Sequence, residues 1–238
     1  MNDVDDSTGR RPRAETHEPL SRTRILEAAL RLIDAEGLDA LSMRRLGSEL
    51  GVEAMSLYHY FPSKDALLDG VVDEVLGEVP LPDPTGTDWA EALREGFADF
   101  RRVMLAHPAV FPLVASRPPS SSEAMRPIAI AFNLFQAAGF GPREAVSAWD
   151  GLLAYVFGHI LLQISGGMAV AHGGKLIEVV QDQTGDEFAA LRAAWSTAGD
   201  WDMELAFLAG LDTVIDGLRQ GLGADRPASH STQSLRST

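Results

Sequence analysis

The sequence contains no cysteine, and only two of its 20 basic residues, Lys64 and Lys175, are lysines. Without cysteine the chain can form neither disulfide bonds nor thiolate metal sites, which is typical of a cytoplasmic protein. No apolar run reaches the roughly 18 residues that span a bilayer. The N-terminal residues include no apolar segment of the kind found in a signal peptide. We therefore expect a cytoplasmic protein without a membrane-spanning helix.

Acidic residues outnumber basic ones, and the formal net charge is -14. The excess is uneven, because residues 10–64 hold nine basic and eight acidic side chains, whereas residues 65–238 hold eleven and 23. A strongly acidic surface is repelled by the phosphates of nucleic acids. Any contact with DNA is therefore expected from the nearly neutral N-terminal part.

The hydrophobic pattern predicts an all-α fold, because apolar residues recur with helical spacing and no segment alternates as a strand would. The expected helices span approximately residues 21–36, 42–49, 53–60, 63–78, 89–106, 121–138, 142–164, 184–196 and 202–220, with a short piece after Pro108. A proline-rich linker at 80–88 and a glycine-rich loop at 165–175 interrupt them. Residues 1–20 and 223–238 are expected to be disordered tails. This pattern predicts a smaller helical domain at 21–66 and a larger helical domain at 67–222.

Local residues mark several of these helix ends. Ser42 and Ser63 are suited to cap the helices that follow them, and Gly51 is suited to the left-handed turn between two short helices. Two capping boxes are also predicted, Ser120 with Glu123 and Thr184 with Glu187.

The short helix predicted at 53–60 directs Met55, Ser56, His59 and Tyr60 away from its apolar face. Such side chains are unusual on a solvated surface, and they indicate a face that meets a partner. Two short helices joined by one glycine turn match a helix-turn-helix, in which the second helix enters the DNA major groove. A plain three-helix core is the alternative reading.

The segment EGLDALSMRRLGSELGVEAMSLYHYFPSKDALL resembles the signature of the tetracycline-repressor (TetR) family of transcriptional regulators. The resemblance covers residues 22 to about 70 and rests on nine positions: Gly51, Val52, Leu57, Tyr58, Tyr60, Phe61, Lys64, Leu67 and Leu68. Trp89, the Ser116-Arg117-Pro118 turn and the segment GFGPREA resemble the C-terminal domain of the tetracycline repressors.

The resemblance implies that residues 21–66, the head, form a DNA-binding domain, and that residues 67–222, the body, form a ligand-binding and dimerisation domain. It also implies roles for individual residues of the head. Arg44 matches a base-contacting position, Ser56 a base or phosphate contact, and Tyr58 and Lys64 phosphate contacts. Met55 and His59 stand where members of the family vary and read bases. Together with Tyr60, these residues are the predicted contacts with a double-stranded DNA operator.

A cavity between the middle helices of the body is the expected site of a small-molecule effector. Its candidate lining residues are aromatic, sulfur-containing or polar: Phe97, Phe100, Met104, Phe111, Phe132, Phe135, Trp149, Asp150, Tyr155 and His159. Ordinary core packing is the alternative for the apolar ones, and a satisfied buried group or a residue at a dimer rim for Asp150 and His159. Leu113 stands where a tetracycline repressor has a histidine metal ligand, so we expect no metal and no cofactor.

The resemblance also implies a homodimer that binds the two halves of a pseudo-palindrome. Apolar stripes on the helices at 142–164 and 202–220 are the expected four-helix interface, formed by Val156, Ile160, Leu208, Leu211, Ile215 and Leu218. A ligand in the body would then move the helix at 63–78 and release a repressor from its operator.

Two alternatives of other classes stay open at this stage. A helical enzyme would need converging catalytic groups, and no Ser-His-Asp order, HExxH motif or pair of catalytic carboxylates stands out. The segment GGMAVAHGGK is not a phosphate-binding loop, because Leu176 follows the lysine where serine or threonine is required. An interaction module with an incidental helix-turn-helix is the second alternative.

Overall fold

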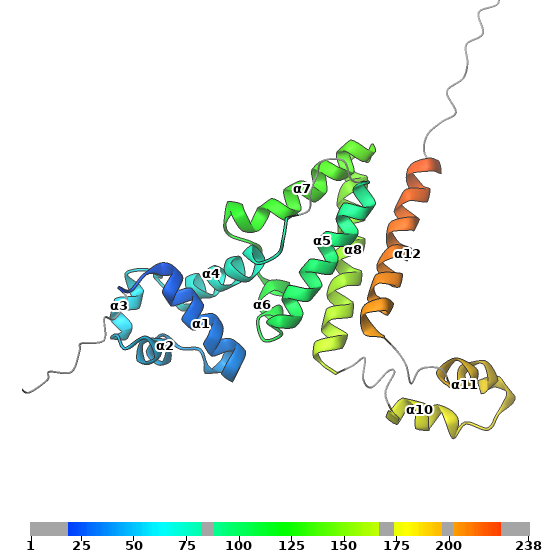
Figure 1. The fold of residues 1–238 in the computed structure, drawn as a ribbon, viewed down its shortest axis with the longest axis horizontal. Coiled ribbons are helices and arrows are strands. Elements are labelled where there is room, and N and C mark those ends of the chain that lie inside the picture. The colour runs from blue at the N-terminus through cyan, green and yellow to red at the C-terminus, as the bar shows by residue number, and fades with distance from the viewer. Residues whose placement is uncertain (1–18, 82–87, 167–173, 197–201, 225–238) are drawn as a thin grey trace, which may run out of the picture.

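The structure, a computed structural model, describes residues 19–81, 88–166, 174–196 and 202–224. Within these ranges the chain forms α-helices and two short 3-10 helices without any strand (Figure 1), which confirms the all-α fold. Most of the two predicted tails, the middle of the proline-rich linker and the middle of the glycine-rich loop lie outside the described residues.

The N-terminal head consists of α1 (Arg22–Glu36), the 3-10 helix η1 (Leu38–Ala40), α2 (Met43–Leu50) and α3 (Ala54–Tyr58). Ser21 and Ser42 cap α1 and α2, because each side chain accepts a hydrogen bond from a backbone N–H in the first turn. Gly51 ends α2 in the left-handed conformation, with φ 69° and ψ 29°. The turn between α2 and α3 therefore forms as the sequence predicts.

Helices α2 and α3 approach each other closely at Gly47. A Cβ atom at this position would lie 2.8 Å from the carbonyl oxygen of Val52 and 3.2 Å from the amide nitrogen of Ala54. Both neighbours are backbone atoms that cannot rotate away. Glycine at position 47 thus lets the two helices adopt this crossing.

Apolar side chains from every helix of the head meet in one core. Ile25, Ile33, Leu46, Leu57 and Phe61 are fully buried there. The Arg22 guanidinium lies 4.1 Å from the centre of the Phe61 ring and covers one face of it. The chain thus holds three short helices together around a single phenylalanine.

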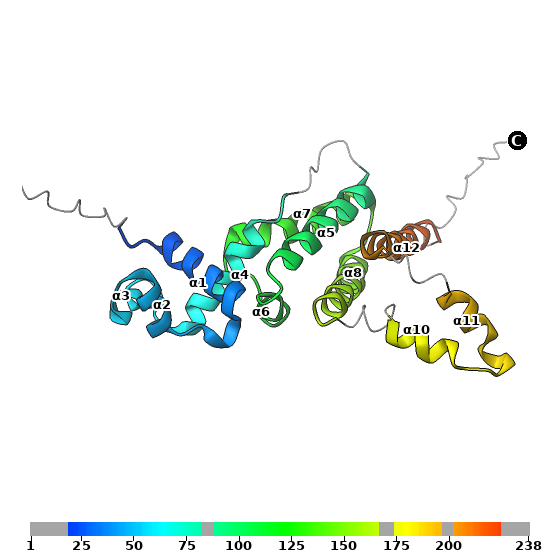
Figure 2. The ribbon, with the colours of Figure 1, turned by 60° about the horizontal axis from the view of Figure 1, so that its bottom comes forward.

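Helix α4 (Lys64–Gly77) connects the head to the body, and Ser63 caps its first turn. It packs against α1 on the head side and against α5 (Trp89–Ala106), α6 (Phe111–Ser116) and α7 (Ser122–Ala138) on the body side. Figures 1 and 2 both show α4 between the two parts. Gly70 allows its close contact with the head, because a Cβ atom there would lie 2.8 Å from Leu26 Cδ2.

The body is built on α8 (Pro142–Ile164), which packs against α5, α7 and α12 (Met203–Ala224). This packing corrects the predicted dimer interface at four of its six residues. Val156, Ile160, Leu211 and Ile215 are buried within the chain's own core, and Leu208 and Leu218 pack against that core. The two apolar stripes therefore face each other inside one chain. Helix α8 is apolar around most of its circumference, so its sequence does not show which side meets α12.

Further corrections concern the C-terminal half. Ser121 caps α7 by accepting from the amide of Ala124, in place of the predicted Ser120. The predicted loop at 165–175 ends earlier, because Gly174–Gln181 forms α10. The helix predicted at 184–196 is the 3-10 helix η2 (Asp186–Phe188) followed by α11 (Ala189–Trp195), so no capping box starts at Thr184. Helices α10 and α11 pack on each other and stand apart from the body in both views.

Helix α8 is long and apolar enough to cross a membrane by length and composition, and 33% of its most apolar window is buried inside the chain. Core helices of soluble proteins also meet this criterion. The exposed apolar side of α8 includes Leu161 and Leu162, which are 53% and 48% exposed. Large apolar side chains exposed on one side of a helix form a surface suited to a partner.

Candidate DNA-binding head and effector cavity

The residues predicted to contact DNA lie at the surface of the head, on α2, on α3 and at the start of α4. Met55 is 70% exposed and Tyr58 42%, and Arg44, His59 and Lys64 are also exposed. Ser56 is half-buried at the same face of α3. Large apolar and aromatic side chains exposed at this level form a surface suited to a partner.

Two adjacent arginines of α2 have different surroundings. Arg45 donates to Glu36 at 2.7 Å and to Glu49 at 2.9 Å, so it ties α2 to the end of α1. Arg44 forms no such ion pair with any residue that the structure describes, and its side chain is exposed. Of the two, Arg44 is the one placed to bind an external group.

Tyr60 is placed to stabilise the head. Its hydroxyl donates to the carbonyl oxygen of Leu20 at 2.7 Å, and its own carbonyl oxygen accepts from Arg22 at 3.1 Å. These bonds fasten the residues before α1 to the end of α3. Tyr60 is itself 37% exposed, but its hydroxyl is engaged within the head, and we interpret it as a residue that orients its neighbours.

A cavity of about 430 Å³ lies in the body. Its wall is formed by the last residues of α4 and the linker (Leu76, Val79, Pro80), by α5, by α6 and the loop after it, and by α7 and α8. Four aromatic side chains line it, and they are paired: Phe97 with Trp149 at 5.6 Å between ring centres, and Phe100 stacked on Phe157 at 5.6 Å. The volume and the aromatic wall suit a drug-sized ligand with flat rings.

Three of the ten predicted cavity residues line this cavity, namely Phe97, Phe100 and Trp149. The structure places Met104, Phe111 and Phe135 in the buried core, and Phe132 between the rings of Phe135 and Trp149. Phe157, which the sequence analysis did not select, lines the cavity. Helical spacing alone does not distinguish a side chain that fills the core from one at a cavity wall.

The three polar candidates on α8 lie elsewhere. Asp150 is exposed. Tyr155 donates its hydroxyl hydrogen to the carbonyl oxygen of Phe207 at 2.7 Å, and the buried His159 packs edge-on against the Phe207 ring. Tyr155 and His159 therefore belong to the contact between α8 and α12, which corrects their assignment to the cavity.

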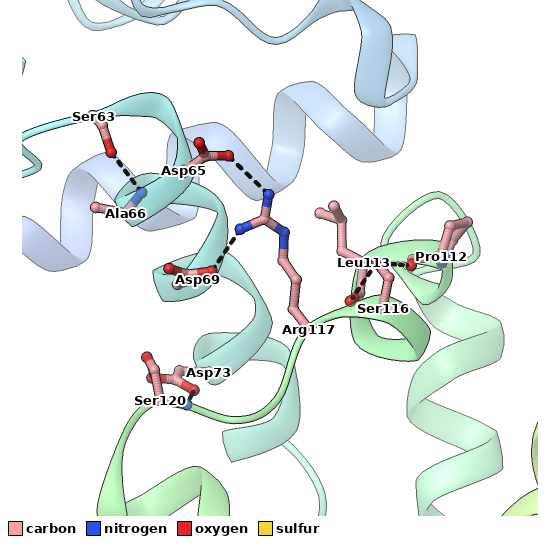
Figure 3. A network of polar contacts seen from close by, with 10 residues as sticks. All are labelled: Ser63, Asp65, Ala66, Asp69, Asp73, Pro112, Leu113, Ser116, Arg117 and Ser120. Carbon is pink, nitrogen blue, oxygen red and sulfur yellow. Dashed lines mark hydrogen bonds and ion pairs between the residues drawn. The ribbon is translucent and has the colours of Figure 1, made fainter.

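The loop after α6 binds one face of α4, as Figure 3 shows. Arg117 donates to Asp69 at 2.7 Å and to Asp65 at 2.9 Å. Ser120 donates to Asp73 through its backbone N–H at 2.8 Å and through its hydroxyl at 2.6 Å. Three carboxylates four residues apart repel one another on an isolated helix. The four-residue spacing of Asp65, Asp69 and Asp73 in the sequence therefore indicates a cationic partner, which was not predicted.

This clamp, formed by Arg117 and Ser120 on the three aspartates, joins the cavity to α4. Residues 116–119 line the cavity, and the same loop holds the helix that begins at Lys64. The Asp65 and Asp69 side chains are 79% and 42% exposed, and ion pairs of such exposure contribute about 0.2–1 kcal/mol each. The clamp is therefore weak enough for a bound ligand to shift.

His107, just after α5, forms a second link between head and body. Its Nδ1 lies 2.8 Å from Asp34 of α1, and its Nε2 lies 3.2 Å from Glu78, which follows α4. Burial opposes the charged imidazole, but the hydrogen bonds and charges of the two carboxylates outweigh it and raise the pKa of His107. The protonated ring thus holds α1 and the end of α4 to the body.

We expect this link to depend on pH. Because the pKa is raised on folding, its stabilising contribution is fully present below the unfolded value of about 6.5 and is lost as pH rises through the folded value. Thermal melts of the wild type and of His107→Asn should therefore differ most at pH 6 and least at pH 9. Burial also raises the pKa of nearby Glu74, but in both proteins, so the difference isolates His107. A difference that is constant with pH would contradict the assignment.

Comparisons with known proteins follow this geometry. Residues 25–71 match the family described as "Bacterial regulatory proteins, tetR family", and residues 81–222 match the "Tetracyclin repressor-like, C-terminal domain". The second match alone covers more than half of the chain. The chain belongs to the TetR family.

Relatives of this TetR-family chain are named as transcriptional regulators. An HTH-type transcriptional regulator of Saccharopolyspora erythraea is 35% identical over 147 residues, 62% of either chain. The HTH-type transcriptional repressor DrrR1 of Streptomyces coeruleorubidus is 39% identical over 156 residues, which cover 63% of this chain and 56% of that protein. The matched part thus spans about three fifths of the length of these two curated relatives.

Solved structures of the family extend the likeness to the body. Apo ActR of Streptomyces coelicolor is 34% identical, with a TM-score of 0.76 over 87% of this chain and 98% of that one. ActR in complex with actinorhodin gives a TM-score of 0.75 over 87% and 100%. A TetR variant of Acinetobacter baumannii in complex with minocycline is 27% identical, with a TM-score of 0.66 over 89% and 99%.

Among the described residues no group of three or more His, Asp or Glu side chains is arranged to hold a metal ion. Leu113, which stands where the tetracycline repressors have a histidine ligand, is buried in α6. The side chains at the cavity wall are aromatic, aliphatic or hydrogen-bond donors. The lining residues that the structure describes do not fit a metal-tetracycline complex, because none of them offers an imidazole or a carboxylate to a cation.

Proposed function

We propose that the protein is a homodimeric, cytoplasmic repressor that binds a pseudo-palindromic DNA operator and leaves it when a small aromatic molecule occupies the body cavity. The observation that carries this proposal is the exposed face of the head, where Arg44, Met55 and Tyr58 form none of the side-chain hydrogen bonds with described residues that engage Arg45 and Tyr60. The name of DrrR1 as a repressor and the complex of ActR with actinorhodin support it.

The DNA contacts follow from the chemistry of these side chains. Arg44 can donate two hydrogen bonds to O6 and N7 of a guanine, and Met55 can pack on a thymine methyl. Tyr58 and Lys64 are suited to phosphates, which fix the register of the head on the duplex. Ser56 and His59 complete the face as donors to a base or a phosphate.

Replacing Arg44 by alanine should reduce operator affinity roughly 10- to 100-fold, because a bidentate guanine contact contributes about 1–3 kcal/mol. Lys64→Ala should also reduce the slope of log affinity against log salt by about one unit, since one fewer counterion is released. Fluorescence anisotropy with a duplex obtained by in vitro selection measures both quantities. Arg102→Ala is the matched control, because Arg102 is an exposed arginine of the body. Full affinity in both head variants would refute these contacts.

The cavity supports an effector built from flat rings. Two pairs of aromatic side chains form its wall, and stacking on such pairs favours planar polycyclic molecules. A solved structure of ActR is a complex with actinorhodin, and this chain is similar to that structure over 87% of its length. We therefore extend small-molecule binding to this chain without assigning the compound.

The position of α4 gives the effector a way to act on the head. The end of α4 and the residues that follow it line the cavity, and Lys64 lies at its other end, about 20 Å away for a 14-residue helix. A tilt of α4 therefore moves Lys64 and the head around it. A ligand releases DNA in this way only if it binds the tilted state more tightly, with a coupling of about 1–3 kcal/mol being typical.

The dimer is proposed to form through the outer faces of α8 and α12, opposite the stripes that the chain buries itself. These faces share small or apolar residues at helical spacing, all exposed except the half-buried Gly158: Gly151, Ala154, Gly158, Leu161 and Leu162 on α8, and Leu205, Ala209, Thr213 and Gly217 on α12. A Cβ atom at Gly151, Gly158 or Gly217 would meet nothing within 4 Å. Small residues let helices of a second copy approach closely and cover the exposed apolar side of α8.

A further inference from the structure

The polar side chains of the described cavity wall are those of Ser116, Arg117 and Trp149. Arg117 and Trp149 can donate hydrogen bonds but cannot accept them, and no carboxylate or imidazole is among the lining residues that the structure describes. The Ser116 hydroxyl already donates to the carbonyl oxygen of Pro112 at 2.7 Å within α6. Arg117 is thus the one charged side chain of the described lining, and its charge favours an anionic ligand.

Arg117 has a second position in the fold, because it is also the cation of the clamp on α4. Its guanidinium lies between Asp65 and Asp69 (Figure 3). It donates to these two carboxylates at 2.9 and 2.7 Å. No other residue of the described chain both lines the cavity and forms an ion pair with α4. Arg117 therefore contacts both the cavity and the helix that leads to the head.

We propose that the effector is an aromatic anion, with a carboxylate, sulfonate or phenolate group that pairs with Arg117 in place of Asp65 and Asp69. This inference rests on the proposed function of the cavity and adds the charge of its ligand and the contact that it breaks. Loss of the two ion pairs leaves α4 held to the loop by Ser120 alone. The helix is then free to tilt at its N-terminal end, where Lys64 lies.

The ligand and the α4 carboxylates compete for Arg117 for an electrostatic reason. A guanidinium between two carboxylates already has a local charge of -1, so a third anion is repelled unless one pair opens. Pairing with α4 and pairing with the ligand therefore weaken each other, and the effect is reciprocal. Removing an α4 carboxylate should tighten the binding of an anion, and it should leave a neutral ligand of the same shape unaffected.

Two fluorescent probes with one ring skeleton test this in the full-length protein. 1-Anilinonaphthalene-8-sulfonate is anionic, and N-phenyl-1-naphthylamine is the same skeleton without the sulfonate. We expect Arg117→Gln to weaken the anionic probe roughly tenfold or more, as for loss of a charge-assisted hydrogen bond, and the neutral probe less than about twofold. Asp69→Asn should strengthen the anionic probe about threefold. Ile128→Trp, which fills the cavity from α7, identifies binding inside it, and Ala129→Trp, exposed beside it, is its control.

Each outcome separates the inference from the proposed function. If both probes bind in the cavity with affinities that neither Arg117→Gln nor Asp69→Asn changes, the anionic effector is excluded while an aromatic site stands. If Ile128→Trp affects neither probe, the cavity does not bind aromatic molecules and the proposed function itself fails. Should Arg117→Gln not fold, the tightening in Asp69→Asn, with no change for the neutral probe, still decides the question.

Discussion

Ala154→Arg is expected to convert the proposed dimer to a monomer and to reduce operator affinity roughly a hundredfold or more, because two linked heads gain about 10²–10⁴ over one. Ala154 is exposed on the outer face of α8, between Gly151 and Gly158. An arginine there is solvated in a single chain. At a close contact between helices it would be buried without a partner and would keep the two copies apart.

Gln136→Arg is the matched control, because it places the same charge on an exposed position of α7, away from the proposed interface. Light scattering measures the mass in solution, and anisotropy measures operator affinity. We expect Gln136→Arg to remain a dimer with wild-type affinity. If Ala154→Arg is also a dimer, the two copies meet through another surface, and the proposed use of α8 and α12 is wrong.

The head could be predicted almost entirely from the sequence because its signals are local. Ser42 and Ser63 cap the helices that directly follow them, and Gly51 forms the turn at its own position. Each of these residues acts within three or four positions of the chain. The helix boundaries of the head therefore follow from local contacts, without reference to tertiary packing.

The body was less predictable because its decisive contacts join distant residues. Arg117 pairs with carboxylates 48 and 52 positions away, and Tyr155 bonds a carbonyl oxygen 52 positions away. Helix α8 is apolar on most sides, so periodicity showed that it is buried but not which side meets α12. The cavity residues and the dimer faces both depend on that orientation.

The same contrast separates the two adjacent serines before α7. Both Ser120 and Ser121 satisfy the local rule for a helix cap. The capping-box spacing of Ser120 and Glu123 favours Ser120 in the sequence. The structure uses Ser121 as the cap, and Ser120 bonds Asp73 on α4. A tertiary contact thus decided between two locally equivalent choices, and it did so at the loop that links cavity and head.

Phe61 is the position where one substitution should affect the head most. Its ring is fully buried, packs against α4 at Gly70 and is covered by the Arg22 guanidinium. Truncation of such a ring costs about 3–5 kcal/mol, through lost burial and the cavity that remains. That loss is a large fraction of the stability of a small domain. We therefore expect Phe61→Ala to unfold the head at temperatures where the body stays folded.

Hydrogen exchange with mass spectrometry distinguishes this from general unfolding. In Phe61→Ala, the amides of α1, α2 and α3 should exchange much faster than in the wild type, while those of α5 and α8 keep their protection and operator binding is lost. Met55→Ala is the control for amide protection alone, because Met55 is 70% exposed in the same segment and its truncation should change stability by less than about 0.5 kcal/mol. Equal loss of protection in the head and in α8 would show that Phe61 stabilises the whole chain. In that case head and body unfold as one unit, and α4 transmits stability as well as movement.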